Sequence, residues 1–266
     1  MQNFLYSVPE GERGKTYKQI VKWMWYLTAV GVLSVILFFI ILSFSDLPSV
    51  EQLENPKSEL ASQVFANNGE VLGRYYTENR VPVDFSDLSP HLISALIATE
   101  DERYYDHCGI DFEALGRVAF KTVLLGQRSS GGASTITQQL AKLLFTGKPG
   151  SGLERVIQKF KEWIIAVRLE RKYTKQEIIA MYLNKFNFIN GAYGIKAASE
   201  IYFGKTQDTL QIQEAAMLVG MLKNPSLYNP LRRAEEVKKR REVVLKQMQK
   251  NKLLSREEYD SLRALP

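Results

Sequence analysis

Two adjacent carboxylates end a predicted helix in the segment ATEDERYYDHCGID, residues 98–111. Glu100 and Asp101 are followed by aromatic side chains, and Gly109 provides a turn at which the chain can reverse. A carboxylate at a helix end beside aromatic rings can act as a general base. A solvated helix end, whose charges pair with each other, is the alternative that this segment alone leaves open.

A second polar group follows a pair of glycines in RSSGGASTITQQLAKLLF, residues 128–145. Thr135 and Gln138 have the spacing of a helix capping box. Thr135, Gln138 and Lys142 then share one helix face, and free amides at the helix start attract anions. The pattern favours a phosphate-binding site, and an ordinary loop before a well-capped helix is the alternative.

The next predicted helix, within residues 153–184, carries cations and a carboxylate on one face. Arg155, Lys159 and Glu162 fall at i, i+4 and i+7, while apolar side chains occupy another face. Two cation-bearing helices after a glycine-rich loop favour a diphosphate site. A solvated helix with i,i+4 ion pairs is the alternative.

Composition leaves few other groups for chemistry. The chain has 266 residues, 45% hydrophobic and 24% charged, which is typical of one or two folded domains. Its single cysteine, Cys108, excludes an intrachain disulfide framework, and two histidines offer few zinc ligands. The net charge of +6 suits a phosphate or membrane partner and falls short of a dedicated nucleic-acid binder.

Residues 23–44 form an uncharged apolar run that is long enough to cross a membrane as one helix. Basic residues dominate before the run and acidic residues after it, which predicts a cytoplasmic N-terminus. Trp23, Trp25 and Tyr26 would mark the inner interface. No small-residue cleavage site follows, so the run predicts a retained anchor rather than a signal peptide, and the rest of the chain would work outside the cytoplasm.

The elements that position the polar groups are expected to be mostly helical. A hairpin is predicted over residues 63–76, with its turn at 67–69. Helical periodicity covers 93–100, 112–125, 135–145, 154–172, 175–184, 193–202, 211–222 and 234–250. The expected fold class is therefore mainly α.

Five segments in this order resemble the peptidoglycan glycosyltransferases, which form the N-terminal domain of class A penicillin-binding proteins and the monofunctional transglycosylases. They are EDERYYDHCGID, GGASTITQQLAKLLF, QKFKEWIIAVRLER, EIIAMYLNKFNF with GAYGIKAASEIYFGK, and EAAMLVGMLKNPSLYNP. The resemblance implies a lysozyme-like helical lobe and a smaller membrane-dipping jaw, residues 112–125, behind one transmembrane helix. The expected organisation is a cytoplasmic tail (1–22), a transmembrane helix (23–44), a linker (45–59), the glycosyltransferase domain (60–250) and a connector (251–266).

The resemblance also implies an activity: polymerisation of lipid II into β-1,4-linked glycan strands with inversion and release of undecaprenyl diphosphate, in cell-wall synthesis. Glu100 matches the general base. Glu162 matches a second glutamate that assists departure of the diphosphate or organises its cations. The expected substrate-binding residues are Asp101, Thr135, Gln138, Gln139, Lys142, Arg155 and Lys159.

A divalent cation, Mg²⁺ or Mn²⁺, is expected near Glu162, and no organic cofactor is expected. The expected partners are lipid II, the growing strand, the bilayer and other cell-wall synthesis proteins, with no nucleic acid. Gln158 departs from the family, which usually has Arg at this position, so one phosphate contact is in question.

Two other functions stay open at this stage. Two carboxylates also suit a lysozyme-like lytic glycosidase, although hydrolysis of a neutral glycosidic bond needs no cations for a diphosphate. An inactive membrane-anchored scaffold that binds precursors is the third possibility. No SxxK-type transpeptidase segment follows. We therefore expect either a monofunctional enzyme or the front part of a bifunctional one, and the second is favoured.

Overall fold

The computed structural model describes residues 10–44, 62–65, 71–75, 81–125, 132–145, 147 and 149–265; in 10–15, 62–65, 71–75 and 123–125 only the backbone is described. The chain divides into two units, Met1–Leu47 and Pro48–Pro266.

The first unit contains one long helix, α2 (Glu10–Phe44). Its apolar part, Thr16–Phe44, spans 29 residues, which corresponds to about 40 Å of helix and exceeds the thickness of a bilayer core. Large apolar side chains are exposed along it, for example Trp25 at 71% and Leu27 at 72%. The predicted single apolar helix is confirmed, and it begins earlier than residue 23 because helix-forming residues precede the apolar run.

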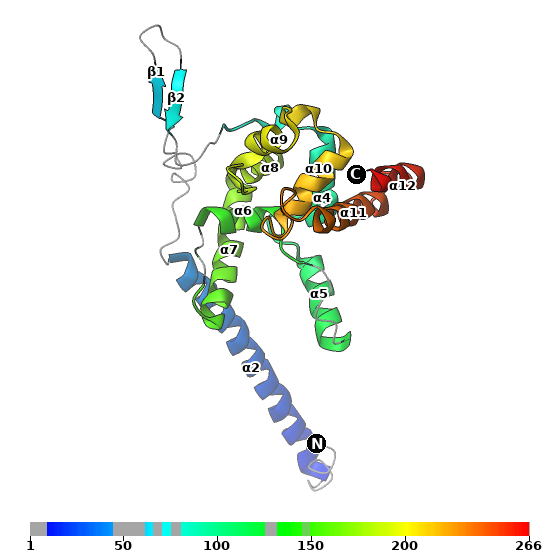
Figure 1. Cartoon of the computed structure of the whole chain (residues 1–266). Helices are drawn as coiled ribbons and strands as arrows, with labels where there is room; N and C mark the ends of the chain where they lie inside the picture. The colour runs from blue at the N-terminus through cyan, green and yellow to red at the C-terminus, as the bar shows by residue number, and fades with distance from the viewer. Residues whose placement is uncertain are drawn as a thin grey trace. The chain divides into compact units, whose positions relative to one another are not determined.

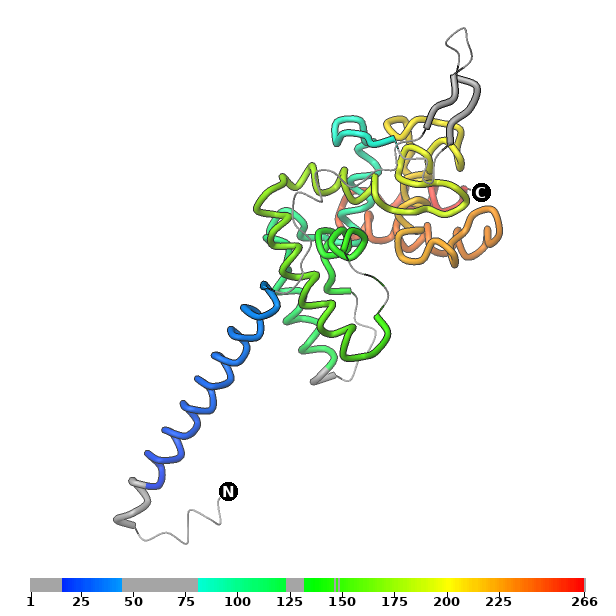
Figure 2. Tube along the Cα trace, turned by 90° about the vertical axis from the view of Figure 1, so that its left-hand side faces the viewer, coloured from blue at the N-terminus to red at the C-terminus, as the bar shows by residue number. Residues whose placement is uncertain are grey.

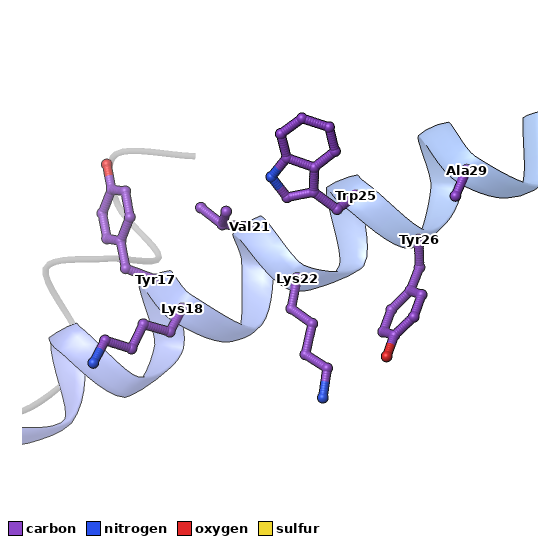
Figure 3. A pocket seen from close by; sticks show the side chains of 7 residues that line it. All are labelled: Tyr17, Lys18, Val21, Lys22, Trp25, Tyr26 and Ala29. Carbon is purple, nitrogen blue, oxygen red and sulfur yellow. The ribbon is translucent and has the colours of Figure 1, made fainter. Parts of the chain in front are cut away.

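A hollow runs beside the first turns of α2 (Figure 3). It is lined by Tyr17, Lys18, Val21, Lys22, Trp25, Tyr26 and Ala29. Aromatic rings and lysines are the side chains that lie at a membrane–water interface. No carboxylate lines this hollow, so it offers no place for the acid–base chemistry expected from the sequence.

In the second unit, β1 (Ser62–Phe65) pairs antiparallel with β2 (Val71–Tyr75). Ser62 lies opposite Tyr75, and the register shifts between Val64 and Phe65. The predicted hairpin is confirmed, whereas its predicted turn lies outside the described residues.

The remaining elements are helices, so the predicted mainly α fold class is confirmed. They are η1 (Phe85–Asp87), α4 (Pro90–Glu100), η2 (Tyr104–Asp106), α5 (Phe112–Leu125), α6 (Ile136–Phe145), α7 (Gly152–Lys172), α8 (Lys175–Lys185), α9 (Gly194–Phe203), η3 (Gln207–Thr209), α10 (Ile212–Leu222), α11 (Ala234–Lys250) and α12 (Arg256–Ala264). The six predicted helices from 135 to 250 agree with α6 to α11 within two residues at each end. Residues 256–264, expected to be a connector, form α12 and pack on α11 and α10.

Two groups of helices build the core of this unit (Figure 1). In one group, α10 packs against α4 and α11; in the other, α6 packs against α7 and α8. The interior is aliphatic, with Leu92, Leu96, Leu140, Ile178, Val219 and Leu245 at or near 0% exposure. The end of α4 lies close to α6 and α11, which are far from it in the sequence: Glu100 contacts Gln139 of α6 and Arg240 of α11. Figures 1 and 2 show these helices in the same part of the unit.

The described part of α5 differs from these packed helices. It extends away from them in Figure 1, and its aromatic residues Phe112 and Phe120 are 73% and 60% exposed. Ala114 is buried, so α5 contacts the rest of the unit mainly at its start. Val123, Leu124 and Leu125, also expected on the jaw, have no described side chains.

Candidate active site

Glu100 is the last residue of α4, and both oxygens of its carboxylate have partners. Oε2 accepts a hydrogen bond of 3.0 Å from Nε2 of Gln139 on α6. Oε1 lies 3.6 Å from Nη2 of Arg240 on α11. The Glu100 side chain is 16% exposed, so it is largely enclosed but still accessible. The predicted base therefore has a defined orientation.

Gln139 is itself oriented by Tyr182 of α8. The Tyr182 hydroxyl donates a hydrogen bond of 2.8 Å to Oε1 of Gln139. Burial raises the pKa of Tyr182 well above its ordinary value, and the charge of Glu100 raises it further, so the hydroxyl keeps its proton. Because its oxygen is occupied, Gln139 directs its amide N–H groups toward Glu100. Direct substrate contact by Gln139 stays a prediction.

Asp101 faces inward and is 7% exposed. Its Oδ2 accepts the backbone N–H of Ile136 at 3.0 Å, at the start of α6, where a negative charge is stabilising. Nε2 of His107 lies 3.0 Å from Oδ1. Because Nδ1 of His107 accepts the N–H of Gly109 at 3.1 Å, Nε2 carries the proton that is donated to Asp101. The structure shows Asp101 joining the loop after α4 to α6, while its predicted substrate contact stays a prediction.

The carbonyl oxygen of Gly109 connects the same loop to α6. It accepts hydrogen bonds from Oγ1 of Thr135 at 2.7 Å and from Nε2 of Gln138 at 3.0 Å. Gly109 has φ +88°, and a Cβ there would lie 3.0 Å from the backbone of Ala166 on α7, so only glycine fits. Thr135 also accepts the backbone N–H of Gln138, which is one half of the predicted capping box of α6. The other half is absent, because the Gln138 side chain bonds Gly109 and does not reach back to Thr135. Both polar residues are buried, and their predicted contact with substrate stays a prediction.

Lys175, at the start of α8, contacts the loop that follows α4. Its Nζ donates to the carbonyl oxygen of His107 at 2.7 Å and to Glu170 at 2.8 Å, and it lies 4.3 Å from the ring centroid of Tyr104. Thr137 of α6 donates to the same Glu170 oxygen at 2.6 Å. A partly buried polar network thus connects α6, α7 and α8 beside the segment that follows Glu100.

The loop ends at Asp111, which caps α5 by accepting the N–H of Ala114 at 2.8 Å. Nε of Arg103 donates to Asp111 at 3.1 Å, and Arg103 also pairs with Glu113. Burial alone would raise the pKa of Asp111, but the hydrogen bonds from Arg103 and Ala114 outweigh it and leave the pKa below its ordinary value. The charged Asp111 therefore fixes this end of the loop through its contacts with Arg103 and Ala114.

Glu162 lies on α7 and is 5% exposed. Its Oε2 accepts from Nζ of Lys159 at 3.1 Å, and the same ammonium donates to Oγ of Ser134 at 2.7 Å. The structure therefore brings the predicted second glutamate and a predicted diphosphate-binding cation together, next to the loop before α6. The Lys159 side chain stays 38% exposed, so it can reach a ligand.

The remaining predicted cations lie at exposed positions. Lys142 is in the last turn of α6 and Arg155 in the first turns of α7, and both are exposed. Gln158, which replaces the family's arginine, donates from Nε2 to the carbonyl oxygen of Gly147 at 3.1 Å. In this structure its side chain supports the loop before α7. The phosphate contacts of Lys142 and Arg155 stay predictions.

The residues around Glu162 do not fit a resident divalent cation. Within the described residues, no group of three or more His, Cys, Asp and Glu side chains could hold a metal ion. One oxygen of Glu162, Oε2, contacts the ammonium of Lys159. The predicted Mg²⁺ or Mn²⁺ therefore stays a prediction without a protein site.

The sequence patterns alone do not reveal Arg240, which pairs with Glu100, or Tyr182, which orients Gln139. The buried stripe of α11 contains Val237, Arg241, Val244, Leu245 and Met248, so the sequence pattern points to a cation in need of a partner at Arg241 and not at Arg240. Nothing in the sequence identified Glu100 as the partner of Arg240.

The fold and the site define a helical enzyme that combines a held carboxylate with a second carboxylate and a cation. The model of the transglycosylase family matches residues 68–249, so the chain belongs to that family. The expected class of enzyme, a peptidoglycan glycosyltransferase of cell-wall synthesis, is thereby confirmed.

The chain is also similar to much longer curated proteins. It is 38% identical to penicillin-binding protein 1A of Vibrio cholerae over 252 residues, which covers 95% of this chain and 30% of that protein. It is 38% identical to penicillin-binding protein 1A of Escherichia coli, with 82% of this chain and 25% of that protein covered. It is 40% identical to penicillin-binding protein 1F of Bacillus subtilis, with 74% and 27% covered. The chain thus spans about a third or less of these relatives.

A crystal structure of penicillin-binding protein 1A from Haemophilus influenzae matches 78% of this chain and 21% of that chain, at 26% identity and a TM-score of 0.44.

Proposed function

We propose that the chain joins lipid II units into β-1,4-linked glycan strands, with inversion and release of undecaprenyl diphosphate. The observation that carries this proposal is the carboxylate of Glu100, whose two oxygens are held from two other helices. A carboxylate held in this way can accept the proton of a sugar hydroxyl that binds within hydrogen-bond distance.

In the proposed step, the 4-hydroxyl oxygen of an incoming lipid II attacks the anomeric carbon of the growing strand. The hydroxyl proton passes to Glu100 while the new C–O bond forms. The bond to the diphosphate breaks, and its electron pair stays on the leaving oxygen. Because an α-linked donor gives a β-linked product, one displacement is sufficient, and no covalent glycosyl-enzyme forms.

The departing diphosphate gains negative charge, which cations placed in advance can stabilise. Lys159 is the principal candidate, because Glu162 and Ser134 hold its ammonium while its side chain remains partly exposed. Lys142 and Arg155 would contribute further charge from α6 and α7. We assign no step to a divalent cation.

The proposal places the enzyme at a membrane, with the N-terminus in the cytoplasm and the helical unit outside it. The apolar helix α2 supports the anchor, and the basic residues before it support the orientation. Exposed Phe112 and Phe120 on α5 give the helical unit an apolar surface for the bilayer that carries the substrate. Other cell-wall synthesis proteins stay predicted partners.

Polymerisation of purified lipid II by the full chain in detergent tests the proposal. We expect long glycan products that lysozyme digests. Release of fragments from preformed peptidoglycan without polymerisation would indicate a lytic enzyme instead. Binding of lipid II without either activity would indicate a precursor-binding scaffold.

A further inference from the structure

Arg240 has an unusual position for a cation. Its side chain is only 10% exposed, on the face of α11 that packs toward α4 and α10. Nε donates to the carbonyl oxygen of Gly220 at 3.3 Å, and the guanidinium carbon lies 5.8 Å from the ring centroid of Tyr228. Nη2 lies 3.6 Å from Oε1 of Glu100. An enclosed arginine is costly unless it is paired, and Glu100 supplies the charge partner.

Gly220 provides the space for this arrangement. It lies within α10, where glycine is unfavourable for helix stability. A Cβ at this position would lie 3.1 Å from Cγ of Arg240, closer than an ordinary contact. The absence of a side chain at Gly220 therefore allows the arginine stem to pass α10 and reach the end of α4.

We propose that Arg240 is a positioning residue for the general base. It holds Oε1 of Glu100, while Gln139 holds Oε2 and is fixed in turn by Tyr182. A hydrogen bond from Gln139 and an ion pair with Arg240, made from two different helices, restrict rotation of the carboxylate about its last side-chain bond. The restriction keeps one oxygen lone pair directed at the place where the acceptor hydroxyl binds.

The effect on the reaction follows from the geometry that a base requires. A general base works within about 2.6 to 3.2 Å of the proton donor, and a displacement of about 1 Å can lower a rate about 100-fold. Arg240 need not touch the substrate to have this effect. The inference rests on the proposed function, because it assumes that Glu100 is the base.

The first experiment replaces Arg240 in the full chain and measures lipid II polymerisation in detergent. Arg240→Gln should lower kcat about 10- to 100-fold with little change in KM, since donor and acceptor contacts remain. Arg240→Lys keeps the charge but loses the Nε contact to Gly220, so its kcat should lie between those of Arg240→Gln and the wild type. Lys239→Gln is the matched control, because Lys239 is exposed on the same helix and pairs with Glu236.

A second variant avoids removing the enclosed charge. Gly220→Ala places a methyl group against the Arg240 stem and should lower kcat about two- to fivefold while the chain stays folded. In an Arg240→Ala background the stem is absent, so Gly220→Ala should cause no further loss. Losses that multiply in the double variant would show that Gly220 acts independently of Arg240.

The outcomes separate this inference from the proposed function. If Glu100→Gln polymerises lipid II normally, the base assignment fails, and this inference fails with it. If Glu100→Gln is inactive but Arg240→Gln and Gly220→Ala both retain the kcat of Lys239→Gln, the positioning role alone is overturned. A fall in kcat for Gly220→Ala that vanishes in the Arg240→Ala background supports the role.

Discussion

The two glutamates of the site are held in different ways. Glu100 has partners on α6 and α11: Gln139, which the buried Tyr182 orients, and Arg240, whose side chain is 10% exposed. Glu162 pairs with Lys159 of its own helix. The Lys159 side chain is 38% exposed and also donates a hydrogen bond to Ser134. The difference indicates a division of roles. If Glu100 is the base, as proposed, tertiary packing fixes it before substrate arrives, whereas the partly exposed Lys159 can adjust to a bulky, charged leaving group.

The largest expected effect comes from removing either carboxylate. Glu100→Gln should lower polymerisation by about 10² to 10⁴, the usual scale for a lost general base. Glu162→Gln should also impair the enzyme severely. Because both act on one transition state, the loss in the double variant should be smaller than the product of the two. Initial rates with lipid II, measured for all three variants, test this, and fully multiplicative losses would argue for separate steps.

A smaller effect should separate the neighbours on α7. Lys159→Ala removes the cation beside Glu162 and leaves a buried carboxylate unpaired, so we expect about a 10- to 100-fold loss of rate. Gln158→Ala removes only the contact with Gly147 and should cost much less. Gln158→Arg should be tolerated, and rates across a Mg²⁺ or Mn²⁺ titration will show whether it lowers the dependence on added metal. Equal damage from Lys159→Ala and Gln158→Ala would mean that Gln158 contacts substrate.

Sequence patterns were sufficient for most elements and insufficient for the connections between them. Helices α6 to α11 were predicted closely because their apolar residues recur with helical spacing. Helix α12 was missed although Ser255 and Glu258 form a capping box at its start. The pairing of Glu100 with Arg240 joins residues far apart in the chain, and local periodicity carries no information on such contacts. The contact of Gln158 with Gly147 also joins a helix to a loop outside it, so helical periodicity could not predict it.

The exposed aromatics of α5 should matter only where a membrane is present. Phe112→Ser and Phe120→Ser remove exposed apolar surface, so thermal stability should hardly change. With lipid II in liposomes, the double variant should be several-fold slower than the wild type. The same comparison in detergent is the control, and an equal loss in both media would assign these residues to the folded core or the reaction itself.

The smallest effect concerns stability in acid. The pKa of Asp111 is lower in the folded chain than in an unfolded one, so its pairing stabilises the fold above the unfolded value, about 4, and this contribution is lost as pH falls through the folded value. Asp111→Asn should therefore lower the thermal midpoint by a few degrees at pH 7. The two proteins should converge once the pH falls below the folded pKa of Asp111, where its carboxyl is protonated. A constant difference at every pH would show that charge is not the cause.

The central claim, that Glu100 is the base and not a binding residue, is tested most directly by comparing kcat and KM of the full-length Glu100→Gln variant with those of the wild type. The amide keeps the shape of the side chain and can still contact Gln139, but it cannot take a proton at neutral pH. The account predicts that kcat falls by at least about 10² while lipid II binding, measured separately on the same preparation, is retained. Turnover close to that of the wild type, or a loss explained entirely by weaker lipid II binding, would contradict it.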